Sequence, residues 1–242
     1  MSKYSNHLGQ PIGFPVPSWS LRARPPLRPM EGHYCRVEPI DPGRHAADLH
    51  DANRTDEEGR IWTYLPYGPF DTFQAYLLWM ERNALGADPM FHAIVERRTN
   101  KAVGVASYLR INPDHGVIEV GHINYSPLLQ RTPAGTEAMF LMMRRAFDEL
   151  GYRRYEWKCD ALNAASCAAA ERLGFRFEGV FRQAMLYKGR NRDSAWYAII
   201  DKEWPAIKAA FERWLDPSNF DEQDRQRLRL TTLTAMARDG TA

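Results

Sequence analysis

Apolar positions change their spacing in the second half of the chain. From Met139 to Leu150 they recur at intervals of three and four residues, which is the period of one helical face, and Gly151 follows as a typical helix end. This pattern predicts a helix that begins near Thr136. The polar stretch "QRTPAG" (130–135) would then lie directly before the helix.

Apolar and β-branched runs between turn residues predict the strands. We expect them at 33–40, 90–97, 102–111, 116–125, 153–160, 176–189 and 194–200. Short polar turns join the three runs between 90 and 125, which predicts an antiparallel meander. A helix separates 116–125 from 153–160, so these two should be parallel neighbours with a right-handed crossover. The last two runs predict a hairpin that turns across "RNRD" (190–193).

Helical spacing also appears in four other segments. They are 44–54, 71–85 with Asp71 or Thr72 as the cap, 163–174 with Asn163 at its start, and 202–215. Gly174 provides the left-handed residue that ends the third helix. Glu171 and Arg172 are expected on its solvated face.

The two ends of the chain differ from its middle. Residues 10–30 hold six of the sixteen prolines, which disfavours regular helix or sheet in that stretch, so we predict an extended arm over 1–31, anchored by Phe14 and Trp19. We predict a charged, helical tail over 216–242. The 242 residues are 44% hydrophobic with a net charge of +2, which is typical of a globular protein without a global field for nucleic acid or acidic membranes. No run approaches the roughly 20 apolar residues of a membrane span, and a cytoplasmic location is the expectation.

Three cysteines provide no metal or disulfide pattern. Cys35, Cys159 and Cys167 are odd in number and lack CxxC spacing. We therefore expect reduced thiols and no metal site. A cysteine nucleophile at Cys159 or Cys167 is a weak alternative, because neither has a histidine at an evident spacing.

The turn before the central helix is a candidate anion site. Successive backbone N–H groups and the positive end of a helix dipole bind anions without net protein charge. Gly135 would let a ligand approach the backbone, Arg131 would add charge, and Thr136 would cap the helix or bind a phosphate oxygen. An ordinary loop with a helix cap explains the same residues, and both interpretations stay open.

Two motifs together resemble the GNAT superfamily of acyl-CoA-dependent N-acyltransferases. "NAASCAAAERLGF" (163–175) is similar to the helix that follows the splayed strand of that superfamily, and "QRTPAGTEA" (130–138) is similar to its phosphate loop. "IEVGHINY" and "GTEA" resemble the RimJ/RimL-type subgroup. The resemblance covers Gly32 to Trp204. It implies an α+β fold with a mostly antiparallel sheet of about seven strands, helices on both faces, and a domain over 32–215 in which the strands ending at Tyr125 and Asp160 part.

The resemblance also implies acetyl-CoA as the co-substrate and no metal. The residues that it places at the cofactor are Tyr125, Gln130, Arg131, Thr132, Ala134, Gly135, Thr136, Asn163 and Ser166. The N–H of Tyr125 would stabilise the oxyanion of the thioester. Pro133 removes one N–H from the loop, and Ala170 stands where many members have a tyrosine acid, which leaves Ser166 as the hydroxyl near the sulfur.

The acceptor side of the site is less specified. Glu119 is our first candidate for the base, because a carboxylate among apolar strand residues is costly unless it is paired or functional. By period two it should share a face with Gly121, Ile123 and Tyr125, with His122, the second candidate, on the opposite face.

The other candidate acceptor residues are Trp62, Tyr64 and Tyr67, from a loop that caps the cleft in the superfamily, and Asp160. The acceptor would be a small-molecule amine or a peptide N-terminus. A CoA-binding module with little turnover is the alternative, and a homodimer through the C-terminal hairpin is allowed.

Overall fold

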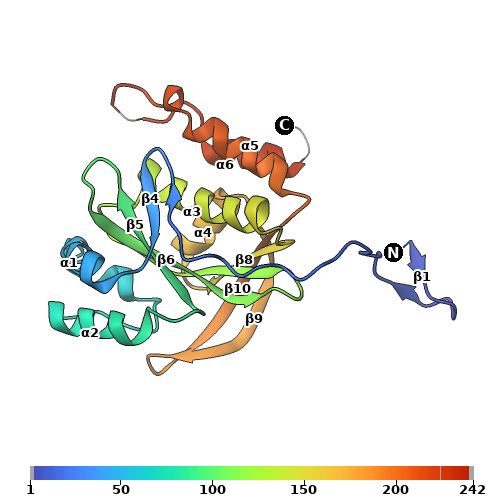
Figure 1. Ribbon diagram of the computed structural model, residues 1–242, viewed down its shortest axis with the longest axis horizontal. Coiled ribbons are helices and arrows are strands. Elements are labelled where there is room, and N and C mark those ends of the chain that lie inside the picture. Colours follow the sequence, from blue (N-terminus) through green and yellow to red (C-terminus); the bar gives the residue numbers. More distant parts are fainter. Residues whose placement is uncertain (1–2, 224, 240–242) are drawn as a thin grey trace.

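A mixed eight-stranded sheet is the centre of the molecule. The structure is a computed structural model that describes residues 3–223 and 225–239. The strand order is β3-β4-β5-β6-β7-β8-β10-β9, and only β7 and β8 are parallel. This confirms the predicted α+β architecture, with the short β3 as an additional strand (Figure 1).

The strands follow the apolar runs of the sequence closely. Their bounds are β3 Met30–Glu31, β4 Cys35–Pro39, β5 Met90–Glu96, β6 Ala102–Asn112, β7 Val117–Tyr125, β8 Arg154–Asp160, β9 Arg176–Tyr187 and β10 Arg190–Ile200. The meander β5-β6-β7 and the crossover from β7 to β8 are as predicted.

Helices cover both faces of the sheet. Their bounds are α1 Pro42–Asn53, α2 Phe73–Asn83, α3 Pro133–Arg144, α4 Ala164–Arg172, α5 Trp204–Leu215 and α6 Leu230–Asp239, with a π turn over Arg145–Glu149 and short 3-10 turns η1 at Arg60–Trp62 and η3 at Pro217–Asn219. One core cluster joins α1 and α2 to the sheet, and a larger one joins α3 to α6 to the other face. The predicted caps Thr72 and Asn163 accept from backbone N–H groups of α2 and α4.

The hairpin of β9 and β10 turns earlier than predicted. Lys188 and Gly189 form the turn, with φ of 48° and 70°, and "RNRD" belongs to β10. Glycine and a polar residue with positive φ are typical of a two-residue turn that matches the twist of the strands. The early turn brings Lys188 to the loop at η1, where its Nζ donates to the Trp62 carbonyl at 2.8 Å.

The N-terminal arm carries a small hairpin of its own. β1 (Tyr4–Ser5) pairs with β2 (Pro11–Ile12), so the prediction of no regular sheet over 10–30 was wrong for β2, and Figure 1 shows this hairpin projecting from the body. Trp19 anchors the arm by donating from Nε1 to the Asp114 carbonyl at 2.7 Å. Phe14 is half exposed and lies beneath Lys202.

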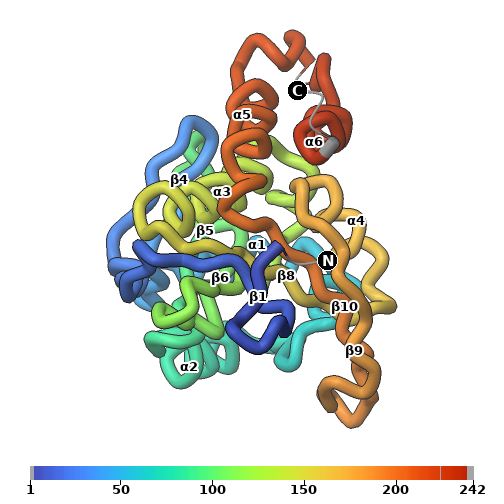
Figure 2. Tube along the Cα trace, turned by 90° about the vertical axis from the view of Figure 1, so that its right-hand side faces the viewer, coloured from blue at the N-terminus to red at the C-terminus, as the bar shows by residue number. Residues whose placement is uncertain are grey.

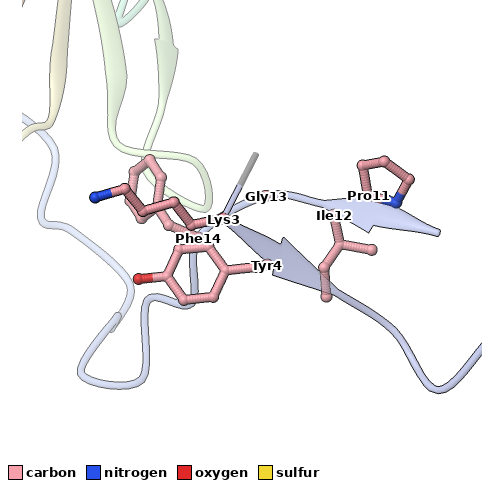
Figure 3. Close-up of a pocket in the computed structure, with 6 residues that line it drawn as sticks. All are labelled: Lys3, Tyr4, Pro11, Ile12, Gly13 and Phe14. Atoms are coloured by element: carbon pink, nitrogen blue, oxygen red, sulfur yellow. The ribbon is translucent and has the colours of Figure 1, made fainter. Parts of the chain in front are cut away.

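Two cavities lie along the arm rather than in the body. One, an open hollow of about 490 Å³, is lined by the hairpin and the residues that follow it, including Tyr4 and Phe14 (Figure 3). The second, of about 690 Å³, lies where the arm meets Asp114 and Arg153. Neither cavity includes a predicted site residue.

The C-terminal tail contributes to the core. Figure 2 shows α6 beside α5, and Leu230 and Leu233 of α6 are buried in the larger cluster. Residues 1–2 of the predicted arm, and 224 and 240–242 of the predicted tail, lie outside the described residues. The division into arm, domain and tail stays a prediction.

Candidate functional site

Strands β7 and β8 pair over only part of their length. Their parallel register runs from Val117↔Arg154 to Val120↔Trp157 and ends there. Gly121–Tyr125 of β7 and Lys158–Asp160 of β8 continue without pairing to each other. We call this opening the fork. The sequence resemblance predicted it between these two strands.

A β-bulge in β7 changes which side chains face each side of the fork. Ser107 pairs with Gly121 and Val105 with Asn124, so Ala106 of β6 opposes two residues, and His122 has φ of 49°. One additional residue reverses the alternation of the strand.

The predicted sharing of faces was therefore right for Gly121 but wrong for Ile123, Tyr125 and His122. Glu119 shares its face with Gly121 and Asn124, whereas Ile123 and Tyr125 pack in the core on the α3 side. His122 lies on the face of Glu119 rather than opposite it, because its ring stacks on Tyr67 at 5.6 Å.

The backbone of Tyr125 points into the fork. Ser126 N–H donates to the Val103 carbonyl, so by the alternation of an antiparallel pair the N–H and C=O of Tyr125 point away from β6 and toward β8. The carbonyl accepts from Gln130 Nε2 at 2.9 Å. Gln130 thus holds the end of β7, and the Tyr125 N–H remains directed into the opening.

Helix α3 begins three residues before the predicted start. Thr132 is the N-cap, because its Oγ1 accepts from Gly135 N–H at 3.1 Å and donates to the Leu129 carbonyl at 2.8 Å. Pro133 is the first helical residue, where the missing N–H costs nothing. Thr136 is not the cap. It is buried, and its Oγ1 accepts from Arg172 Nη1 at 3.1 Å.

Arg172 therefore does not lie on a solvated face as predicted. It is half buried between α3 and α4, with its guanidinium over the Trp214 ring. Burial lowers the pKa of this guanidinium. The sequence around Arg172 did not predict this contact, because Trp214 lies 42 residues further along the chain.

Only part of the loop before α3 keeps free N–H groups. Those of Thr132, Gly135 and Thr136 donate within the protein. Within the described part of the chain, the N–H groups of Arg131 and Ala134 have no acceptor. Unpaired N–H groups at the positive end of a helix are the donors that an anion binds.

Gly135 serves packing within the protein. A Cβ there would lie 2.9 Å from the Leu129 oxygen and 3.0 Å from Tyr125 Cε2, which is closer than a side chain tolerates. We expected glycine at position 135 so that a ligand could approach the backbone. Contacts with Leu129 and Tyr125 are enough to require glycine there. Tyr125 Oη also donates to the Gly135 carbonyl at 2.8 Å, so the end of β7 and the start of α3 are held together.

Helix α4 brings a hydroxyl to the other side of the fork. Asn163 Oδ1 caps the helix by accepting from Ser166 N–H, and Ser166 Oγ accepts from Trp157 Nε1 at 3.0 Å. The hydroxyl also contacts the thiol of Cys159, whose pKa burial raises to about 12 although this contact lowers it. Cys167 Sγ lies 3.6 Å from Cys159 Sγ. Their spacing in sequence did not indicate this proximity. Ala170 is fully buried.

Glu119 is buried and doubly paired. Its Oε1 accepts from Arg110 Nη1 at 2.7 Å, and its Oε2 lies 2.9 Å from Lys158 Nζ. Lys158 also contacts Glu156 at 2.8 Å and lies over the Trp196 ring. A paired carboxylate needs no catalytic role to explain its burial, so the reason for choosing Glu119 as the base is removed.

The predicted acceptor residues differ in their burial and in their hydrogen-bond partners. Trp62 is a core residue with 5% exposure, whereas Tyr67 stacks on His122. Tyr64 Oη donates to the Leu162 carbonyl at 3.1 Å and so ties the η1 loop to the start of α4. Asp160 accepts from Leu162 N–H and from Tyr187 Oη, which occupies both of its oxygens.

His122 is neutral at physiological pH. Burial lowers its pKa to about 4, with further lowering by Arg110 and Arg192. Nδ1 lies 3.3 Å from Tyr67 Oη. The sequence did not indicate Arg110, Lys158 or Arg192 as site residues. They lie on β6, β8 and β10, and only the order of strands in the sheet brings these residues near His122.

A parallel pair of strands that parts beside a helix N-terminus, with a strand amide directed into the gap, defines the class of acyl-CoA-dependent N-acyltransferases that the sequence resembled. The model of the acetyltransferase (GNAT) domain family matches residues 36–176. The chain belongs to the GNAT family of acetyltransferases. Use of acetyl-CoA is a property of that family.

Solved structures agree with this assignment. A GCN5-related N-acetyltransferase from Brucella melitensis is 42% identical, covers 91% of this chain and 100% of its own, and has a TM-score of 0.89. A GNAT-family structure from Chromobacterium violaceum is 40% identical over 81% of this chain and 98% of its own, with a TM-score of 0.75. A structure from Vibrio cholerae named for ribosomal-protein-serine acetylation is 20% identical over 71% of this chain and 97% of its own, with a TM-score of 0.60, and shows the shared fold alone.

Two further features concern metals and membranes. Among the described residues no three His, Cys, Asp or Glu side chains gather in a way that could hold a metal ion. No helix in the described ranges combines the length and apolar character of a membrane span.

Proposed function

We propose that this protein transfers an acetyl group from acetyl-CoA to a primary amine, by direct attack of the amine on the thioester within a ternary complex. The observation that carries the proposal is the fork, with the Tyr125 N–H directed into it. A backbone donor fixed at that position favours the oxyanion that develops during attack, because it needs no reorganisation in the transition state.

The cofactor is proposed to span the fork from the start of α3 to α4. The N–H groups of Arg131 and Ala134 receive the diphosphate, and Thr132 and Gly135 shape the turn that presents them. Gln130 acts by holding the Tyr125 carbonyl rather than by touching phosphate. The side-chain amide of Asn163 binds the pantetheine arm while its oxygen caps α4.

In the transfer step, the amine nitrogen forms the new bond to the carbonyl carbon and the carbon–sulfur bond breaks. We take Ser166 to hydrogen-bond the departing thiolate: its hydroxyl accepts from the Trp157 indole, so its own proton, which also reaches the Cys159 thiol, is the one that it donates. A free thiol has a pKa near roughly 8.5, so this departure needs little assistance. The ammonium proton leaves through water, with neutral His122 as a hydrogen-bond acceptor beside the amine.

Four finer assignments belong to the same proposal. Membership of the RimJ/RimL-type subgroup rests on the "IEVGHINY" and "GTEA" motifs. The acceptor is a small-molecule amine or a peptide N-terminus, and the location is cytoplasmic. The apolar side chains exposed along β9 support a homodimer.

The test is CoA release from acetyl-CoA by the purified protein with a library of primary amines, followed with a thiol-reactive dye. We expect release that requires amine. Ser166→Ala should lower kcat by about tenfold, the value of one hydrogen bond to a charged group, whereas Ser218→Ala, in the exposed turn η3, should not. Calorimetric binding of acetyl-CoA without release by any amine would identify a CoA-binding module instead. Failure to bind acetyl-CoA would refute both functions.

A further inference from the structure

The mouth of the fork has an aromatic floor, made of His122, Tyr67, Trp79 and Phe91. The His122 ring stacks on Tyr67 with 13° between the planes, and Trp79 and Phe91 lie at 4.2 Å from Tyr67 and 5.0 Å from His122, centroid to centroid. This floor lies on the face of β7 that carries Glu119. An acceptor that enters the fork from this side passes over the rings.

The carboxylates near this floor are already engaged. Both oxygens of Glu119 are in ion pairs, with Arg110 and Lys158. Both oxygens of Asp160 accept hydrogen bonds, from Leu162 N–H and Tyr187 Oη. Neither carboxylate has an unengaged oxygen for a second ammonium group of the acceptor.

Cationic donors remain on both sides of the opening. Arg110 on β6 uses one nitrogen for Glu119, and half of its side chain is exposed. Arg192 on β10 donates from Nε to Ser194 Oγ at 3.0 Å. Among the described residues, the terminal nitrogens of Arg192 have no acceptor. Because β7 and β8 lie between β6 and β10 in the sheet, Arg110 and Arg192 come from strands on opposite sides of the fork.

Both guanidinium groups act on the floor itself. Each lowers the pKa of His122 in addition to the effect of burial. Lys188, at the tip of the hairpin, adds a third positive charge beside the Trp62 carbonyl. The mouth therefore offers hydrogen-bond donors and positive charge over an apolar surface.

We infer that the acceptor is an amine that carries an anionic group, a carboxylate or a phosphate, which Arg192 and Arg110 bind at the mouth while the amine reaches the fork. A guanidinium presents paired N–H donors that match such groups. Polycationic amines are disfavoured, because they would meet like charge without a free carboxylate. The inference rests on the proposed function, since it takes the amine to be the group that is acetylated.

The first test compares amines in matched pairs. The pairs are L-phenylalanine with phenethylamine and phosphoethanolamine with ethanolamine, with spermidine as the polycation, each at equal concentrations of the unprotonated amine. We expect kcat/KM at least tenfold higher for each anionic member. The preference should shrink as salt is raised, because exposed charges are screened over roughly 10 Å at 0.1 M.

A variant assigns the preference to one residue. Arg192→Gln should raise KM for the anionic acceptor by about tenfold, the order of 1.4 kcal/mol, and leave KM for acetyl-CoA unchanged. Arg190→Gln, two residues away on the same strand and exposed, is the matched control and should change neither. Equal kcat/KM for anionic and neutral members, or an unchanged preference in Arg192→Gln, would overturn the inference.

A binding measurement separates this inference from the proposed function. The probes are 3-phenylpropionate, phenyl phosphate and neutral 3-phenylpropionamide, titrated calorimetrically into the wild type and both variants. We expect binding of the two anions alone, and its loss in Arg192→Gln. Such binding without acetyl transfer to any amine would support the anion site and refute the proposed function. No difference between the anions and the amide would refute the anion site, whatever the turnover.

Discussion

Replacing Glu137 with glutamine should destabilise the fold more than any other conservative change on α3. This carboxylate is 5% exposed and accepts from three consecutive backbone N–H groups at the start of β4. His33 N–H donates to Oε1 at 2.7 Å, and the N–H groups of Tyr34 and Cys35 donate to Oε2 at 2.7 and 2.8 Å. A glutamine has one acceptor oxygen, and its NH₂ group would face an N–H donor.

The magnitude follows from those three bonds. Leaving one buried N–H without an acceptor costs about 1–3 kcal/mol, and removing the charge weakens each of the other two bonds by about 1 kcal/mol. We therefore expect a loss of about 3–5 kcal/mol in the free energy of unfolding, which would lower a urea midpoint by roughly 1–2 M at constant slope.

The assay is urea unfolding at pH 7, followed by tryptophan fluorescence. Glu171→Gln is the control, because Glu171 is exposed on α4. The free energy of unfolding of this variant should differ from that of the wild type by no more than about 0.5 kcal/mol. A loss below about 1 kcal/mol in Glu137→Gln would refute the reasoning, since it would mean that the three N–H groups find other acceptors at little cost.

Three further predictions concern titration, the helix cap and assembly. Burial lowers the pKa of His92 from 6.5 to about 4, so its contribution to stability is present above pH 6.5 and should fall by about 2 kcal/mol between pH 7 and pH 5. His92→Gln should remove this part of the pH dependence and leave the part that comes from His122, whose pKa is lowered alike, whereas His115→Gln, which is exposed, should change neither part. Thr132→Ala removes the cap of α3, so it should lower the free energy of unfolding by about 1 kcal/mol and raise KM for acetyl-CoA severalfold. Thr132→Ser should restore both values. An unchanged KM in Thr132→Ala would mean that the cap does not contribute to binding of the cofactor phosphates. If β9 forms a dimer edge, the wild type should sediment as a dimer and Phe181→Glu, at a position 54% exposed, as a monomer; a monomeric wild type would end that proposal.

Sequence patterns specified most of the architecture because they report local chemistry. The apolar period of α3, the turn-bounded runs of the meander and the caps Thr72 and Asn163 each depend on neighbours within a few residues, and all agree with the structure. The fork followed from a resemblance carried by two short motifs. These features needed no knowledge of which strands lie side by side.

The chemistry of the acceptor side depends on contacts that local pattern does not contain. One bulged residue at His122 reversed the alternation along β7, and period two alone assigns the wrong face beyond such a residue. The partners of Glu119 and the position of Arg192 depend on β6, β8 and β10, which are far apart in sequence but lie close together in the sheet. The sequence by itself determined the family and most of the sheet. Only the tertiary structure decided which charges are paired and which remain for a ligand, because pairing depends on distances between strands that the chain brings together when it folds.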